Sequence, residues 1–233
     1  MKTMRNRFLA ISSLLLLGAT FFTQFANAQM STPPATPAEI EAMYTSSIES
    51  RTDDILKALA LTNSAAASRV HDLIIAQYRV MRSRDDLINA KLEAMGKDID
   101  YENRASDLEA QSKLLHQHFF DQLAKVLTPA QIDTVKDKMT YNKVKVTYDA
   151  YNNIIPKLTE TDKAKIMELL KAAREKAVDG GSATEKSEIF QQYKNQINDY
   201  LNAHGHDVAK AYKDWETKQA VQASTNTSTN VVR

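Results

Sequence analysis

The segment from Met139 to Asn153 (MTYNKVKVTYDAYNN) contains the residues best suited to binding a ligand, with three tyrosines and three asparagines within fifteen residues. Tyrosine combines an apolar ring with a hydroxyl, and an asparagine amide both donates and accepts hydrogen bonds. This combination suits a sugar, which has apolar faces and a rim of hydroxyls. The candidate binding residues here are Tyr141, Asn142, Tyr148 and Tyr151. Tyr148 and Tyr151 are also spaced like half-buried packing residues on one helix face, and this alternative stays open.

The other chemistry-bearing residues favour neither a metal site nor a nucleophile. His116 and His118 are two positions apart, so on a helix they point in different directions, and His204 and His206 flank a helix-ending glycine. The absence of cysteine excludes disulfides, thiolate nucleophiles and cysteine-ligated metals. Neither a G-x-S-x-G elbow nor a glycine-rich phosphate loop occurs. We therefore predict no cofactor and no bound metal, and we assign no catalytic residue.

The first 28 residues have the features of a secretory signal peptide. Lys2, Arg5 and Arg7 precede an apolar run of 15 residues, Phe8 to Phe22, which ends before the small-residue site Ala26-Asn27-Ala28. The run is short for a membrane-spanning helix, which needs about 20 apolar residues. We expect cleavage after Ala28. Without a cysteine for lipid attachment, the product should be periplasmic or secreted, with no stable membrane anchor.

The charge balance argues against a nucleic-acid partner. The chain has 30 Lys and Arg residues against 29 Asp and Glu residues, and loss of the three signal-peptide cations would leave 27 against 29. Electrostatic binding to nucleic acid requires a basic excess, usually on one face. A carbohydrate is the ligand class that the residues suggest. Ligand identity and oligomeric state stay open.

Helical periodicity and helix-start signals dominate the rest of the chain. Residues 29–37 form a proline-rich lead-in, residues 38–221 the helical domain, and residues 222–233 a polar tail expected to be disordered. Capping boxes are predicted at Thr36, Thr128 and Ser182. These patterns predict a single all-α domain of seven or eight helices. A long N-terminal helical hairpin should pack on a C-terminal cluster of shorter helices.

Several blocks between Leu127 and Asp207 resemble a family of exported bacterial proteins, domain of unknown function 3826. The blocks are Leu127-Thr128-Pro129-Ala130-Gln131, Met139-Thr140-Tyr141-Asn142, Val146-Thr147-Tyr148-Asp149-Ala150-Tyr151, Pro156, Ala173-Arg174-Glu175-Lys176-Ala177, Asp179, Ser182, Tyr193-Lys194, Ile197-Asn198, Tyr200-Leu201 and Gly205-His206-Asp207. The resemblance implies an all-helical exported protein of polysaccharide-degrading Gram-negative bacteria, with a sugar-binding role. His206 departs from the family pattern, which has tyrosine there.

The polar residues inside these blocks extend the set of candidate binding residues. The resemblance adds Arg174, Asp179, Lys194 and Asn198. Lys194 and Asn198 are four residues apart and would share a helix face. Structural roles are equally open, since Asp179 could anchor the Gly-Gly turn and Arg174 could pair with a carboxylate on its own helix.

The leading hypothesis is non-catalytic carbohydrate binding in an extracytoplasmic glycan-utilisation system. A periplasmic chaperone or envelope-stress protein is the first alternative, because Leu127 to Gln131 matches a Leu-Thr-x-x-Gln motif of periplasmic stress chaperones and a long amphipathic hairpin could bind unfolded chains. The second alternative is a helical enzyme acting on glycans. It would need two carboxyl groups about 5 to 9.5 Å apart beside the tyrosines.

Overall fold

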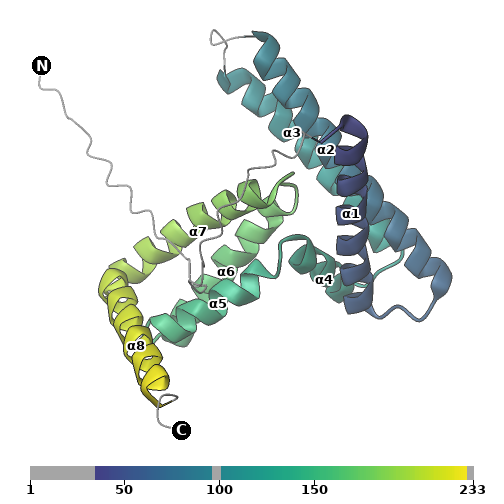
Figure 1. The fold of residues 1–233 in the computed structure, drawn as a ribbon. Helices are drawn as coiled ribbons and strands as arrows, with labels where there is room; N and C mark the ends of the chain where they lie inside the picture. The colour runs from purple at the N-terminus through teal and green to yellow at the C-terminus, as the bar shows by residue number, and fades with distance from the viewer. Residues whose placement is uncertain (1–34, 96–100, 230–233) are drawn as a thin grey trace, which may run out of the picture.

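A computed structural model describes residues 35–95 and 101–229, and these residues form eight α-helices and no strand (Figure 1). The helices are α1 (Pro37–Leu59), α2 (Ser64–Met95), α3 (Tyr101–Ala124), α4 (Pro129–Met139), α5 (Lys143–Ile154), α6 (Glu160–Ala177), α7 (Ala183–Ala203) and α8 (Val208–Thr229). The prediction of a single all-α domain is confirmed. The predicted signal peptide and most of the lead-in lie outside the described residues. None of the described helices has the length and apolar character needed to cross a membrane.

Local capping determines where the helices begin. The predicted boxes at Thr36 and Thr128 are both present, with each threonine hydroxyl accepting from the backbone three residues later. A third reciprocal box, not predicted, opens α6 at Thr159. The predicted box at Ser182 is only half formed. Its hydroxyl accepts from the Glu185 amide at 3.0 Å, but the Glu185 carboxylate accepts from Gly181 instead.

The helices surround two apolar cores that lie side by side (Figure 1). The N-terminal core is formed by α1 to α4, with the predicted long hairpin of α2 and α3 at its centre, and contains Ile55, Ile74 and Leu123. The C-terminal core is formed by α5 to α8 and contains Ile166 and Ile197. The short helix α4 packs on α1 and α3, so it belongs with the hairpin rather than with the predicted cluster of short helices.

The turn between α6 and α7 connects the two cores. Val178 leaves the end of α6 and is buried in the N-terminal core, where it is 1% exposed. The Asp179 carbonyl accepts a hydrogen bond from Arg84 of α2 at 2.8 Å, and the Asp179 carboxylate lies 2.9 Å from Nδ1 of His116 on α3. Both helices of the hairpin therefore contact a single turn of the C-terminal half. This turn is called the junction turn below (residues 178–182).

The last helix extends beyond its predicted end. The sequence predicts a disordered tail from residue 222, whereas α8 continues to Thr229. Serine, threonine and asparagine have low propensity for the interior of a helix. Extending an existing helix costs much less than nucleating a new one, because each further residue adds a hydrogen bond.

Replacing Gly181 by alanine should weaken the junction. A Cβ at Gly181 would lie 1.4 Å from Oδ2 of Asp85, whose carboxylate accepts from the Arg84 guanidinium at 2.7 Å. We expect Gly181→Ala to lower the free energy of unfolding by about 1–2 kcal/mol, measured by urea denaturation. In an Asp85→Ala background the cost should fall to a few tenths of a kcal/mol, since the clashing carboxylate is gone. An equal cost in both backgrounds would contradict the proposed clash.

Candidate functional site

Two adjacent residues in the turn between α4 and α5 have left-handed backbone conformations. Tyr141 has φ of 58° and Asn142 has φ of 54°. Residues other than glycine adopt this region at a cost, and bulky ones rarely do. Hydrogen bonds impose the conformation here, since the Asn142 amide donates to the Asp137 carbonyl at 2.7 Å and the buried Thr140 hydroxyl donates to the Lys136 carbonyl at 2.8 Å. Strained, exposed residues of this kind cluster at binding sites.

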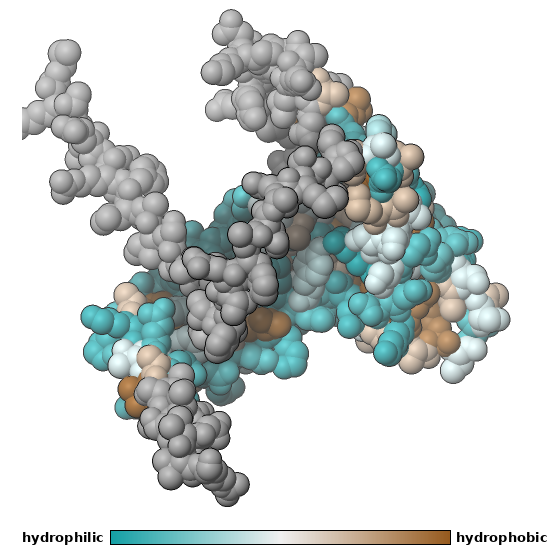
Figure 2. Space-filling model, viewed as in Figure 1, coloured by the Kyte–Doolittle hydropathy of each residue, from teal (hydrophilic) through white to brown (hydrophobic). Residues whose placement is uncertain are grey.

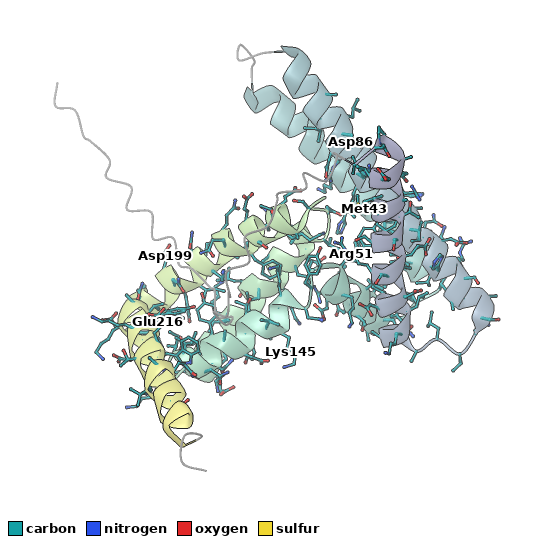
Figure 3. All side chains as sticks on the ribbon, viewed as in Figure 1. Met43, Arg51, Asp86, Lys145, Asp199 and Glu216 are labelled. Atoms are coloured by element: carbon teal, nitrogen blue, oxygen red, sulfur yellow. The ribbon has the colours of Figure 1, made fainter. Side chains whose placement is uncertain are left out.

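The side chains of this turn are available to a ligand. Tyr141 is 38% exposed, and Asn142 is exposed and makes no side-chain capping bond to α5. Arg51 of α1 lies with Cζ 5.6 Å from the Tyr141 ring centroid, which is within cation–π range. In Figure 3, Arg51 lies on the side of α1 that faces the C-terminal half. An aromatic ring, an amide and a guanidinium therefore share one surface.

Tyr78 of α2 and Lys186 of α7 lie behind this surface. Burial raises the pKa of Tyr78 to about 12, which keeps its phenol neutral, and both Arg51 and Tyr141 are close enough to influence that pKa. Lys186 is 2% exposed, and its ammonium donates to the carbonyls of Ala177 and Val178 at 2.9 and 3.1 Å. It thereby caps the C-terminus of α6 and fixes the junction turn.

Two further lysines extend the positive charge along α5 and α7. Lys143 is the first residue of α5, and Lys194 is half-buried on α7. Burial lowers the pKa of Lys194, and the nearby charge of Lys143 lowers it further. We call the set of Arg51, Tyr141, Asn142, Lys143 and Lys194 the Tyr141 site. It draws one residue from the N-terminal core and the rest from the α4–α5 turn and the helices of the C-terminal core.

Three of the predicted binding residues have packing positions instead. Tyr151 is 1% exposed, and its hydroxyl donates to Oδ1 of Asn198 at 2.7 Å and to the Lys194 carbonyl at 3.2 Å. Tyr148 is half-buried against the C-terminal core. The predicted helix face of Lys194 and Asn198 does exist, but the Asn198 amide oxygen and the Tyr151 phenol bond each other in the packing of α5 on α7.

Arg174 and Asp179, the other predicted residues, lie at contacts between the two halves. The Arg174 side chain is 6% exposed and donates to Asp137 at 2.8 Å and to Asp133 at 2.6 Å, both on α4. Its pairing with its own helix, through Glu175 at 3.2 Å, is only one of three ion pairs. The adjacent carboxylates of Asp133 and Asp137 thus neutralise a buried guanidinium, which gives no support to a role as a glycosidase pair.

Sequence reasoning missed Arg51, Tyr78, Lys143 and Lys186. Arg51 and Lys143 occupy ordinary charged positions, and nothing local distinguishes them. The burial of Lys186 could have been predicted from the sequence. It precedes Phe190 by four residues, on a face of α7 that continues through Lys194 and Ile197. A lysine on an apolar stripe indicates a buried cation that needs partners.

A groove lies at the other end of the C-terminal half, away from the Tyr141 site. It is an open groove of about 330 Å³ lined by Ile155, Pro156, Lys157, Gly205, His206, Asp207, Lys210, Ala211 and Asp214. His206, where the family pattern has tyrosine, lies 3.1 Å from Oδ2 of Asp162. Hydrogen bonds from Thr159 and His206 hold the pKa of Asp162 at about 2. None of the predicted binding residues lines this groove. Among the described residues no cluster of acidic or histidine side chains could bind a metal.

The molecule is thus an all-helical protein with a strained, exposed turn beside cationic side chains. It belongs to the family described as Protein of unknown function (DUF3826), whose model matches residues 45–221. The matched range begins within α1 and ends within α8, so it includes the whole Tyr141 site. The family resemblance expected from the sequence is confirmed. No curated protein matches the sequence significantly.

The buried ammonium of Lys186 should make stability depend on alkaline pH. Burial lowers the pKa of Lys186 from 10.5 to about 8. Between pH 8 and pH 10.5 the unfolded chain binds the Lys186 proton more tightly than the folded protein does. The contribution of Lys186 to the free energy of unfolding is therefore lowest below pH 8 and rises with pH. The expected rise reaches about 3 kcal/mol at pH 10.5.

Urea denaturation of the wild type and of Lys186→Met between pH 7 and 10.5 tests this expectation. The wild type should gain stability relative to Lys186→Met as the pH rises, whereas Tyr78 and the other tyrosines titrate alike in both proteins. Lys145→Met controls for removal of an exposed lysine, since Lys145 pairs with Asp149 on the surface. A constant difference between wild type and Lys186→Met across this range would contradict a lowered pKa.

Proposed function

We propose that the protein is exported, loses its signal peptide after Ala28, and binds carbohydrate at the Tyr141 site without catalysing a reaction on it. The observation that supports this most is the exposed ring and amide of Tyr141 and Asn142, which are kept in left-handed conformations by hydrogen bonds of the turn. Each such conformation costs about 1–3 kcal/mol, a cost that folding must offset elsewhere.

The chemistry of the Tyr141 site matches that of a sugar. An aromatic ring packs against the apolar C–H face of a pyranose, and an asparagine amide donates to one hydroxyl and accepts from another. The Arg51 guanidinium adds donors beside the ring. Because the turn is already fixed, binding would order few additional backbone torsions, which limits the entropic cost of association.

A chaperone function is the second candidate, and one observation favours it. Large apolar side chains are exposed along α1 and the hairpin: Ile40, Met43, Val80, Leu87, Leu114 and Leu115. Apolar and polar surface alternate over the half of the molecule that carries α1 and α2 (Figure 2). Exposed apolar surface of this kind can bind unfolded chains. It is scattered rather than continuous, and for this reason carbohydrate binding ranks first.

Substitutions in the α4–α5 turn should reduce carbohydrate binding without unfolding the protein. We expect Tyr141→Ala to weaken binding about tenfold or more, because losing roughly 1.4 kcal/mol of ring contact has that effect. Asn142→Gly should also weaken binding while preserving stability, since glycine adopts φ of 54° without strain. Calorimetric titration with oligosaccharides selected on a glycan array measures both effects.

Two control variants make this experiment specific. Tyr141→Phe keeps the ring and should stay within about threefold of the wild-type affinity, because stacking dominates. Val146→Ala removes a 62% exposed apolar side chain from α5 and should leave binding unchanged. If glycans bind to Tyr141→Ala with the same affinity as to the wild type, the carbohydrate binds somewhere other than the Tyr141 site. If residues 29–233 bind no glycan, the proposed function is wrong.

Aggregation assays separate the chaperone candidate from carbohydrate binding. If the protein is a chaperone, it should suppress aggregation of a heat-denatured client at near-stoichiometric ratios. A Leu87→Ser, Leu114→Ser double variant should then lose that suppression, because these side chains are 56% and 69% exposed on the hairpin. No suppression by the wild-type protein would remove this candidate.

A further inference from the structure

Three cations of the Tyr141 site make no ion pair within the described part of the chain. They are Arg51, Lys143 and Lys194. Several other cations of the helices do have carboxylate partners, as Lys145 has in Asp149, Lys163 in Glu160 and Lys210 in Asp214. What distinguishes the three is their place: Arg51 lies beside the Tyr141 ring, and half-buried Lys194 lies close enough to Lys143 for that charge to lower its pKa.

The sequence explains why these lysines lack partners on their own helices. Helical ion pairs form between residues three or four apart. For Lys143 those positions on α5 are Val146 and Thr147, and for Lys194 they are Gln191, Phe190, Ile197 and Asn198. None is acidic. The nearby cations instead repel each other, and α5 begins at Lys143 without a side-chain cap, which adds the positive end of its dipole.

Burial strengthens the electrostatic effect of this charge. Lys194 is half-buried next to the Lys143 charge, and the Arg51 charge also reaches buried Lys186. Charges next to low-dielectric protein are screened less than fully exposed ones, so they attract an anion more strongly. A neutral sugar would leave these repulsions in place. An anionic group placed beside the Tyr141 ring would offset them and could accept two parallel hydrogen bonds from Arg51.

We propose that the ligand of the Tyr141 site is an acidic carbohydrate, in which a uronate carboxylate lies between Arg51 and the ammonium groups of Lys143 and Lys194. This inference rests on the proposed carbohydrate-binding function and specifies its ligand class. The Tyr141 ring contacts the face of the sugar, Asn142 bonds a hydroxyl, and the three cations select the negative charge. A sulfate ester offers related chemistry, so sulfated sugars form a separate arm of the test.

Calorimetric titration of residues 29–233 with matched oligosaccharides tests the proposal. The probes are galacturonate, glucuronate and mannuronate oligosaccharides, each paired with its methyl ester, together with neutral and sulfated galactan oligosaccharides. We expect at least one uronate to bind tenfold or more tightly than its own ester. Its affinity should fall several-fold between 50 and 300 mM NaCl, because salt screens charge pairs near a surface.

Charge-removing variants locate the effect on the protein. Arg51→Gln and Lys194→Met should each weaken uronate binding about tenfold and leave binding of the methyl ester within twofold. Lys145→Gln is the matched control, because this lysine lies on α5 away from α1, is 79% exposed and is paired with Asp149 (Figure 3). It should bind like wild type. Circular dichroism and thermal unfolding of each variant verify the fold.

The outcomes separate this inference from the proposed function. If esters and neutral oligosaccharides bind as tightly as uronates, through Tyr141, then the carbohydrate-binding function stands and the acidic specificity is overturned. If only the sulfated probe binds, and Arg51→Gln weakens that binding, the anionic site stands and the uronate assignment is wrong. If no probe of any class binds, both proposals fail.

Discussion

The packing of the junction turn against the long hairpin is the contact on which the rest of the structure depends. Val178 is buried in the N-terminal core, while the residues on either side of it continue into α6 and α7 of the C-terminal core. Asp179 bonds the hairpin through both its carbonyl and its carboxylate. Gly181 allows the Asp85 side chain to approach closely. The two cores could be displaced relative to each other only by breaking these contacts, whereas the position of Arg51 relative to Tyr141 follows from the packing of α4 on α1.

Two buried cations help to fix how the helices of the two cores pack. The Lys186 ammonium caps the last carbonyls of α6, and Arg174 binds Asp133 and Asp137 of α4. Buried charges of this kind contribute little net stability, because desolvation offsets their attraction. A displaced arrangement would leave them unpaired, at a cost of several kcal/mol. Apolar burial therefore drives the helices together, and the buried cations discriminate between ways of packing them.

Local signals predicted the helices well, whereas contacts between distant residues could not be predicted. The boxes at Thr36 and Thr128 depend on four consecutive residues, so the sequence reveals them directly. The contact between His116 and Asp179 joins residues 63 positions apart, and no local pattern encodes it. Composition identified Tyr141 and Asn142 as candidate ligand contacts. It could not distinguish them from Tyr151, because only tertiary packing determines that the Tyr151 phenol bonds Asn198 inside the molecule.

The origin of the Tyr141 site in both halves of the molecule has an energetic consequence. Arg51 comes from α1, and Lys143 and Lys194 come from helices of the C-terminal core. A ligand that contacts all three has higher affinity for the docked arrangement of the cores than for any arrangement that separates them. Docking of the two cores strengthens binding of such a ligand by a certain free energy. By linkage, the bound ligand stabilises the docked arrangement by the same amount.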